Sequence, residues 1–139
     1  MFLTRLIYVS TITEKFGDTS LEDILKIGRV NNTKKGITGM LYFKNKYFIQ
    51  CLEGERSLIN ETYNKIRNDE RHCNIVLLEY SQIEMREFKD WCMGYIPSSK
   101  LTDDLILQFS PTAEFTPYEM SGASANLLML EFKKNFKSF

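Results

Sequence analysis

The sequence has no excess of charge of either sign, because its 18 Lys and Arg residues equal its 18 Asp and Glu residues. A balanced chain has no overall field that would attract a polyanion, and no basic run replaces one. No apolar stretch approaches the ~18 residues of a membrane span, and the start of the chain lacks the pattern of a signal peptide. These absences argue against nucleic acid or membrane as a partner, and we expect a cytoplasmic protein.

Cysteine and histidine are scarce, with three residues and one residue. Cys51, Cys73 and Cys92 form no CxxC pair, and two of them lie in apolar, strand-like runs, so we interpret all three as reduced packing residues. His72 has no Cys or His partner at the spacing of metal ligands. The sequence therefore predicts no metal site.

The residues that are present suit one soluble domain. The chain has 139 residues, of which 43% are hydrophobic and 26% charged, enough to bury a core. Alternation and helical spacing predict strands over residues 6–10, 37–43, 47–53, 74–80 and 90–96, with a tight turn at 44–46. Ser20 is expected as the N-cap of a first helix that ends near Gly36, and Ser57 opens a second helix.

The predicted order is βαββαββ, which indicates an α+β fold of the ferredoxin-like type. Two right-handed crossovers place both helices on one face of a mixed sheet. Helical patterns over residues 101–109 and from Ala123 onward predict a helical pair on the other face. The strands are apolar on both sides, as expected when both faces of a sheet are buried.

Gln50 is the most informative residue, since it places a primary amide inside the apolar run of residues 47–52. A buried amide without a partner costs about 1–3 kcal/mol, so either a neighbour or a ligand must satisfy it. Period-two alternation puts Gln50 on one face of its strand, with Tyr8 on the first strand and Trp91 and Met93 on the last. We expect these four side chains to converge between the sheet and the two helices.

The same space can hold a planar heterocycle. Ile24 and Ile66 are placed to clamp a flat aromatic body from either side. Asn31 and Asn32, at the end of the first helix, can hydrogen-bond its polar edge.

Several ordered motifs carry a family resemblance across nearly the whole chain. They are residues 5–10 (RLIYVS), 31–32 (NN), 36–41 (GITGML), 48–54 (FIQCLEG), 69–72 (DERH), 91–93 (WCM), and the tail at 108–117. Together they closely resemble the BLUF domain, the blue-light sensor that uses FAD, and in particular its short stand-alone PixD-type members. The resemblance implies a flavin-binding core over residues 1–97 and a helical extension of the same domain over residues 98–139.

The resemblance also implies the chemistry. FAD would lie between the two helices, with FMN or riboflavin as alternatives, and Gln50 would hydrogen-bond the flavin and Tyr8. Excited flavin would take an electron and a proton from Tyr8, and Gln50 would rearrange, leaving a red-shifted signalling state. Trp91 and Met93 would relay the signal.

The family implies further flavin contacts. The residues expected to bind the cofactor are Ile24, Asn31, Asn32, Gln50, Lys65, Ile66, Asp69 and Arg71. At Lys65 some relatives have arginine, so this chain keeps the charge but loses the planar fork. His72 is expected beside the flavin or in a structural role.

Other function classes fit less well. An enzyme of the acylphosphatase type would need an anion-cradling glycine-rich loop beside an arginine, and an RNA-recognition module would need exposed aromatics in basic surroundings. A flavin or small-ligand binding protein without photochemistry stays an alternative. No effector domain follows, so we expect a separate effector protein as partner, together with self-association.

Overall fold

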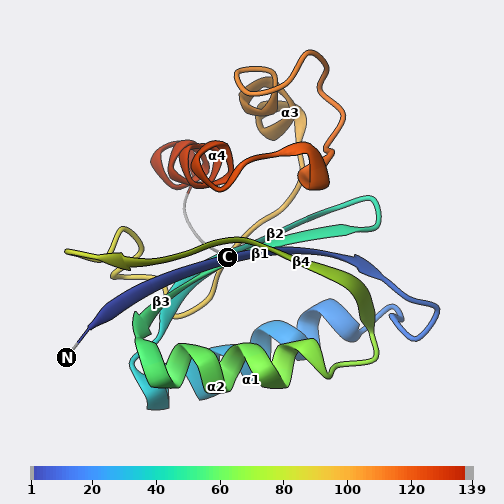
Figure 1. Cartoon of the computed structure of the whole chain (residues 1–139). Coiled ribbons are helices and arrows are strands. Elements are labelled where there is room, and N and C mark those ends of the chain that lie inside the picture. The colour runs from blue at the N-terminus through green and yellow to red at the C-terminus, as the bar shows by residue number, and fades with distance from the viewer. Residues whose placement is uncertain (1, 137–139) are drawn as a thin grey trace.

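The computed structural model describes residues 2–136 and has a five-stranded sheet between two helical layers (Figure 1). The strands are β1 (Leu3–Ile12), β2 (Thr38–Lys44), β3 (Tyr47–Glu55), β4 (His72–Ile83) and β5 (Gly94–Ile96). The helices are α1 (Ser20–Lys35), α2 (Arg56–Arg67), α3 (Lys100–Ile106) and α4 (Gly122–Asn135), with a 3-10 turn at Pro117–Glu119. No helix within residues 2–136 is long and apolar enough to cross a membrane.

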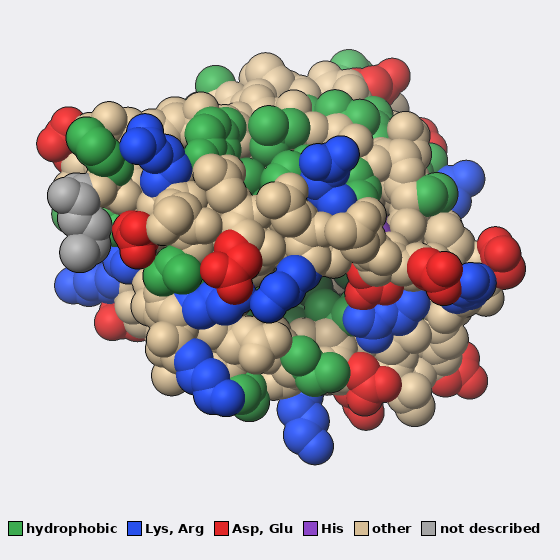
Figure 2. Space-filling model, turned by 60° about the horizontal axis from the view of Figure 1, so that its bottom comes forward, with side chains coloured by type: hydrophobic (Ala, Val, Ile, Leu, Met, Phe, Trp, Pro, Cys, Tyr) green, Lys and Arg blue, Asp and Glu red, His purple; other side chains and the backbone are tan. Residues whose placement is uncertain are grey.

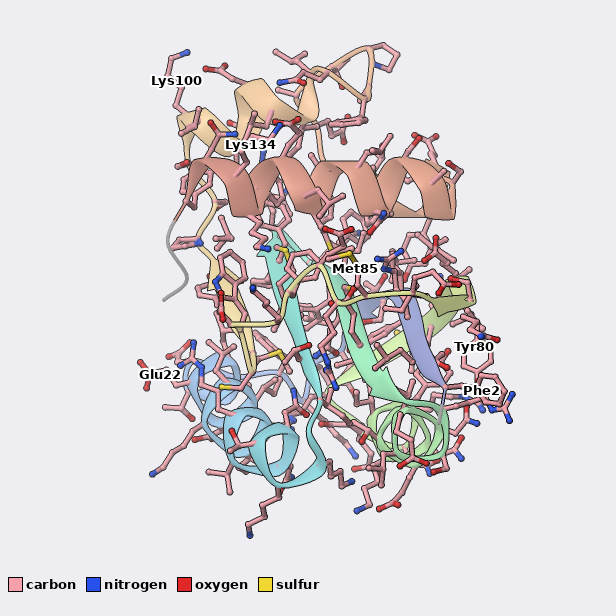
Figure 3. All side chains as sticks on the ribbon, turned by 90° about the vertical axis from the view of Figure 1, so that its left-hand side faces the viewer. Phe2, Glu22, Tyr80, Met85, Lys100 and Lys134 are labelled. Carbon is pink, nitrogen blue, oxygen red and sulfur yellow. The ribbon has the colours of Figure 1, made fainter. Side chains whose placement is uncertain are left out.

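The sheet has the order β4-β1-β3-β2-β5, in which only the β2–β5 pair is parallel. Helices α1 and α2 cover one face, and α3 and α4 cover the other (Figure 1). This arrangement confirms the predicted mixed sheet of ferredoxin-like type with a helical pair on each face. Side chains fill the space between the layers, as the view across the sheet shows (Figure 3).

Each sheet face has its own apolar core, and the alternation of β3 divides its side chains between them. Phe48 and Leu52 belong to the core under α1 and α2. Ile49 and Cys51 belong to the core under α3 and α4, and both are fully buried. The expectation that both faces of the sheet are covered is therefore correct.

Local sequence explains the ends of α1 and the hairpin. Gly36 ends α1 with a φ of 65°, in the left-handed conformation that glycine adopts easily, and its N–H bonds the carbonyls of Asn32 and Thr33. Asn45 has a φ of 60° in the turn between β2 and β3. The predicted N-cap was wrong by one residue, because Thr19 takes that position and the Ser20 hydroxyl accepts from the Gly17 N–H at 2.9 Å instead.

Two further expectations were wrong. Cys73 is exposed, so it is no packing residue, although all three cysteines are free as predicted. The last strand is also shorter than the predicted 90–96, because β5 begins only at Gly94. Before it, the Trp91 carbonyl accepts a hydrogen bond from the Gly39 N–H at 2.8 Å, and the Cys92 carbonyl accepts one from the Asn32 side chain at 2.7 Å. These separate bonds take the place of the regular strand pairing that was predicted there.

Candidate functional site

Tyr8 and Gln50 lie directly opposite each other on the neighbouring strands β1 and β3. They are a paired position in the antiparallel β1–β3 ladder, and both side chains are almost fully buried. Cross-strand partners on one face lie within contact distance, so the ladder alone brings the phenol to the amide. The Tyr8 hydroxyl donates a short hydrogen bond to Gln50 Oε1.

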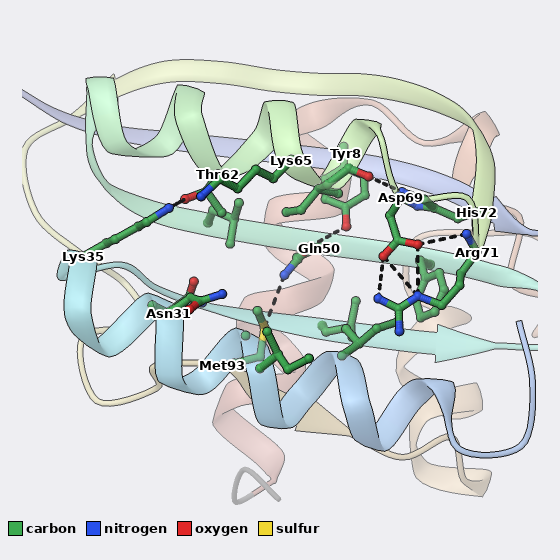
Figure 4. Close-up of a pocket in the computed structure, with 18 residues that line it drawn as sticks. Tyr8, Asn31, Lys35, Gln50, Thr62, Lys65, Asp69, Arg71, His72 and Met93 are labelled. Carbon is green, nitrogen blue, oxygen red and sulfur yellow. Dashed lines mark hydrogen bonds and ion pairs between the residues drawn. The ribbon is translucent and has the colours of Figure 1, made fainter.

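The other end of the Gln50 amide also has a partner. Gln50 Nε2 donates to the sulfur of Met93 at 3.3 Å. The three side chains therefore form one buried line, Tyr8 to Gln50 to Met93, in which the amide accepts at one end and donates at the other (Figure 4). A primary amide carries its acceptor and its donor on two separate atoms, so it can do both at once.

This line forms the floor of a pocket between α1 and α2. The pocket has a volume of about 190 Å³, whereas a second cavity, lined in part by Ile106 and Leu128, has about 10 Å³. Figure 2 shows a recess with hydrophobic side chains inside and charged side chains around it. The lining residues are Tyr8, Ile24, Ile27, Gly28, Asn31, Asn32, Lys35, Leu41, Phe48, Gln50, Leu52, Thr62, Lys65, Ile66, Asp69, Arg71, His72 and Met93.

All eight residues predicted to bind the cofactor line this pocket, together with Tyr8 and Met93. The site residues predicted from the sequence did not include Ile27, Gly28, Lys35, Leu41, Phe48, Leu52 and Thr62, which also line the pocket. On α1 a signal was available, because Ile24, Ile27, Gly28, Asn31 and Lys35 follow helical spacing and so share one face.

Trp91 is the exception, because it does not line the pocket. It was expected to share the face of Met93, but it packs against the core under α3 and α4, with its ring 5.9 Å from that of Phe88. The expectation assumed a regular strand, in which residues two apart point the same way. Residues 91 and 93 lie before β5, where that alternation does not hold. Gly94 makes the Trp91 position possible, since a Cβ there would lie 2.2 Å from the indole ring.

Burial controls the ionisation of Tyr8. Burial raises the pKa of the Tyr8 phenol far above its usual value, and the nearby Tyr63 and Asp69 raise it further. The phenol is therefore protonated at every physiological pH, and its proton lies in the hydrogen bond to Gln50. A buried phenol that loses an electron must also release this proton, because a charge in this environment is costly.

One end of the pocket carries an ion pair. Arg71 Nε donates to both carboxylate oxygens of Asp69, at 3.0 and 3.1 Å, and the Arg71 N–H donates to Asp69 Oδ1 at 2.9 Å (Figure 4). These side-chain hydrogen bonds from Arg71 hold the pKa of Asp69 below its usual value. The fixed carboxylate and guanidinium offer an acceptor and donors at the pocket wall.

His72, the first residue of β4, links the last turn of α2 to β1. One ring nitrogen bonds the Ser10 hydroxyl at 2.9 Å, and the other bonds the Ile66 carbonyl at 2.6 Å. Its ring also meets Tyr8 edge-on at 6.2 Å between centroids. Among residues 2–136 there is no group of His, Cys, Asp and Glu side chains that could hold a metal.

The opposite end of the pocket is basic. Lys35 from α1 bonds Glu61 at 3.2 Å and the Thr62 hydroxyl at 3.4 Å on α2, and Lys65 lies 3.6 Å from Glu61. Lys65 is 70% exposed, so it can reorient toward a ligand at little cost. The pocket thus has a basic end, an apolar middle and an amide floor.

A comparison with protein families matches residues 3–94 to "BLUF: Sensors of blue-light using FAD". The chain belongs to the BLUF family. Its BLUF domain is a flavin-based sensor of blue light, and the sequence resemblance is confirmed.

Curated relatives include the photoactivated adenylate cyclase subunit beta of Euglena longa, 30% identical over 78% of this chain but only 12% of the relative. The blue light- and temperature-regulated antirepressor BluF of Escherichia coli is 35% identical over 62% of this chain and 21% of its own length. The chain thus spans about an eighth to a fifth of these relatives.

Some solved structures match over nearly their full length. BlsA in its photo-activated state has a TM-score of 0.89 and 30% identity, covering 99% of this chain and 98% of its own. BlrB, described as a BLUF protein in its dark state, has a TM-score of 0.80 and 26% identity, with 96% of each chain covered.

The residues of the pocket fit a flavin. Its ring system is flat and apolar on both faces, which suits the aliphatic walls formed by Ile24 and Ile66. Its edge is polar, which suits the amides of Gln50 and Asn32. Asn32 is 2% exposed and uses its Nδ2 group on the Cys92 carbonyl. Its amide oxygen is the group left to meet a ligand.

Proposed function

We propose that this chain works as a photoreceptor in which Tyr8 and Gln50 are the photoactive residues and Met93 is the first residue to receive the signal. The observation that supports this most directly is the buried hydrogen-bonded line from Tyr8 through Gln50 to Met93 on the floor of the BLUF pocket. The bound flavin would supply the absorption of blue light and the acceptance of one electron and one proton.

Tyr8 is the donor in this proposal. Its phenol can lose an electron and a proton together, and the short hydrogen bond directs that proton toward Gln50 Oε1. The raised pKa of Tyr8 means that no phenolate forms beforehand, so the proton moves only when the electron does.

Gln50 converts this transfer into a change of contacts. If its amide turns over, the NH₂ group faces the Tyr8 hydroxyl and the oxygen faces the Met93 sulfur. Sulfur is only an acceptor, so the new arrangement cannot keep the Met93 contact. A tautomer of the amide would also exchange donor and acceptor. Either change alters what Met93 meets, and so the two arrangements define two states.

The other lining residues would hold the flavin. Ile24 and Ile66 would enclose the ring, and Asn31 and Asn32 would bind its polar edge. Asp69 and Arg71 would bind from the opposite wall, and Lys65 at the basic end would favour a phosphate-bearing flavin. FAD fits this pattern, and FMN would share the same phosphate contact.

The output would pass to another protein. The segment before β5 carries Met93 toward the pocket and Trp91 toward α3 and α4, so one short segment contacts both faces of the sheet. We propose that the extension over residues 98–139 presents the changed surface to a separate effector in the cytoplasm, that the chain self-associates, and that it has no enzymatic activity of its own.

An absorption spectrum before and immediately after blue illumination tests the proposal. The purified protein should be yellow, its flavin band should shift to the red in light, and the shift should relax in darkness. The matched variant Gln50→Leu should bind flavin and show no such shift, because leucine has no donor or acceptor to exchange. A Gln50→Leu protein with a normal shift contradicts the proposed role of Gln50, and flavin without any light response in the native chain would favour the alternative of a non-photochemical flavin protein.

A further inference from the structure

Glu53 is a fully buried carboxylate that the proposed photochemistry does not use. It lies three residues after Gln50 on β3 and is 0% exposed. Arg5, its partner across the β1–β3 ladder, donates to Glu53 Oε2 from Nη2 at 3.2 Å and also reaches Glu79 at 3.6 Å. Because β3 alternates, the Glu53 side chain lies on the sheet face opposite the pocket. A buried carboxylate is retained only where its oxygens are satisfied.

The remaining bonds of Glu53 hold one turn of the loop between β4 and β5. Its Oε1 accepts the N–H groups of Glu87 and Phe88 at 3.0 and 2.9 Å. Its main-chain carbonyl accepts Arg86 Nη1 at 2.8 Å. Side chain and backbone of a single residue therefore fix residues 86–88.

Arg86 ties the same turn to the start of β2. It donates from Nη1 to the Thr38 hydroxyl at 2.9 Å and from Nη2 to the Gly36 carbonyl at 2.7 Å. Gly36 is the residue that ends α1, and Thr38 is the first residue of β2. Both elements contribute side chains to the pocket. Met85, labelled in Figure 3, marks the exposed start of this loop beside the sheet.

The anchored turn leads directly to Met93. The Trp91 N–H bonds the Phe88 carbonyl at 3.0 Å, and the Met93 carbonyl accepts Arg29 Nε at 3.1 Å. Between Phe88 and Gly94 there is no regular strand. Within the segment, the Trp91 carbonyl accepts from Gly39 and the Cys92 carbonyl from Asn32, so separate long-range bonds and the anchored turn hold Met93 in place of a continuous ladder.

We propose that Glu53 and Arg86 are positioning residues for the Gln50–Met93 contact. By holding residues 86–88 from the far side of the sheet, they set where the Met93 sulfur lies against the Gln50 amide. This inference rests on the proposed function for its importance to signalling, but the positioning itself is a property of the folded chain with or without flavin.

Methionine methyl NMR measures the position of Met93 directly. The chain has six methionines, and Met93→Leu assigns the resonance of interest. The Met93 methyl lies 3.3 Å from where a Cβ on Gly28 would be, so its chemical shift reports contact with α1. The test variant is Arg86→Met, and the matched control is Lys89→Met, which removes an exposed charge from the same loop.

In Arg86→Met we expect the Met93 methyl resonance to move or broaden, and the amides of Glu87 and Phe88 to exchange about tenfold faster. Lys89→Met should leave both signals as in the native chain. In the flavin-loaded protein, Arg86→Met should also change the rate of dark relaxation several-fold while retaining flavin, which a purely structural residue far from the pocket would not do.

Glu53 variants give a graded second test. Glu53→Gln keeps one oxygen for the two N–H groups, whereas Glu53→Ala removes both acceptors and leaves Arg5 with Glu79 alone. The Met93 shift should therefore change more in Glu53→Ala than in Glu53→Gln. If Glu53→Ala does not fold, Glu53→Gln and Arg86→Met decide the question.

An unchanged Met93 methyl in both Arg86→Met and Glu53→Gln would overturn the inference. The methyl spectrum can be recorded without flavin. A native chain without a light response would therefore refute the proposed function, but it would not decide whether Glu53 and Arg86 position Met93.

Discussion

Replacing Tyr8 by phenylalanine removes one oxygen from the centre of the proposed photochemistry. The ring and its packing stay, so the pocket keeps its shape and its apolar contacts. The lost group is the donor of the short bond to Gln50 Oε1. Because Gln50 is 3% exposed, water does not replace that donor readily.

The burial of this pair sets the size of the effect. A net hydrogen bond contributes about 0.5–1.5 kcal/mol, and a buried acceptor left unpaired costs about 1–3 kcal/mol. We therefore expect Tyr8→Phe to lower the free energy of unfolding by about 1–3 kcal/mol, which lowers the melting temperature by roughly 3–10 °C for a domain of this size. Flavin binding should persist, since the other lining residues are unchanged.

The assay compares the light-minus-dark absorption and the thermal melt of Tyr8→Phe with those of Tyr42→Phe, both in the same flavin-loaded state. Tyr42 is a matched control because it is also a buried phenol, donating to the Thr102 hydroxyl at 3.2 Å on the opposite face of the sheet. Burial raises its pKa to about 12. Tyr42→Phe should keep the full light response, whereas Tyr8→Phe should lose it.

A Tyr8→Phe protein that shows the native red shift would refute the assignment of Tyr8 as donor. Loss of the shift in both variants would instead indicate that destabilisation, and not the missing donor, abolishes the response.

Three further changes test other parts of the structure. Gly39→Ala should destabilise the fold by about 3 kcal/mol or more in a urea titration, because its Cβ would lie 1.9 Å from the Cys51 carbonyl oxygen. Asn32→Ala should weaken flavin binding about tenfold in a fluorescence titration, since a buried amide is removed from the pocket. The pKa of Asp69 is lowered by hydrogen bonds from Arg71, so their stabilising contribution is present above the unfolded pKa of about 3.9 and is lost as the pH falls through the lower folded value. Asp69→Asn should remove that part of the acid dependence of unfolding.

Each of these tests has a control within the chain. Gly17→Ala introduces a Cβ with nothing within 4 Å and should leave stability near that of the native chain. Asn68→Ala, an exposed amide at the end of α2, should leave flavin affinity unchanged. Glu70→Gln removes a neighbouring exposed carboxylate and should keep the acid dependence that Asp69→Asn removes. A test variant indistinguishable from its control would contradict the corresponding argument.

Much of the fold followed from local pattern. Gly36 marked the end of α1 because a left-handed residue is needed there, and alternation in β3 correctly divided Phe48 and Leu52 from Ile49 and Cys51. These predictions succeeded because the signals depend on neighbours in sequence. The edge strand β4 was harder, since Cys73 looked apolar in the sequence but lies exposed on a strand with only one neighbour.

The pocket was predicted in part for the same reason. Residues with helical or alternating spacing, such as Ile24, Gln50 and Ile66, were placed correctly, and all eight expected cofactor residues line it. Thr62 and Leu41 carried no signal of their own, because their place in the pocket depends on how α2 and β2 meet the other elements.

The sequence by itself determined the order of elements, the family and the pairing of the Gln50 amide with the Tyr8 phenol. These depend on periodicity and on short motifs, both of which can be read directly from the sequence. Only the tertiary structure decided that Met93 enters the pocket while Trp91 lies on the opposite face, and that Glu53 holds the turn that leads to them. A strand pattern assumes a ladder, and at residues 91–93 long-range bonds from Gly39, Asn32 and Arg29 take its place. Such bonds join residues more than fifty positions apart, so no local pattern in the sequence could reveal them.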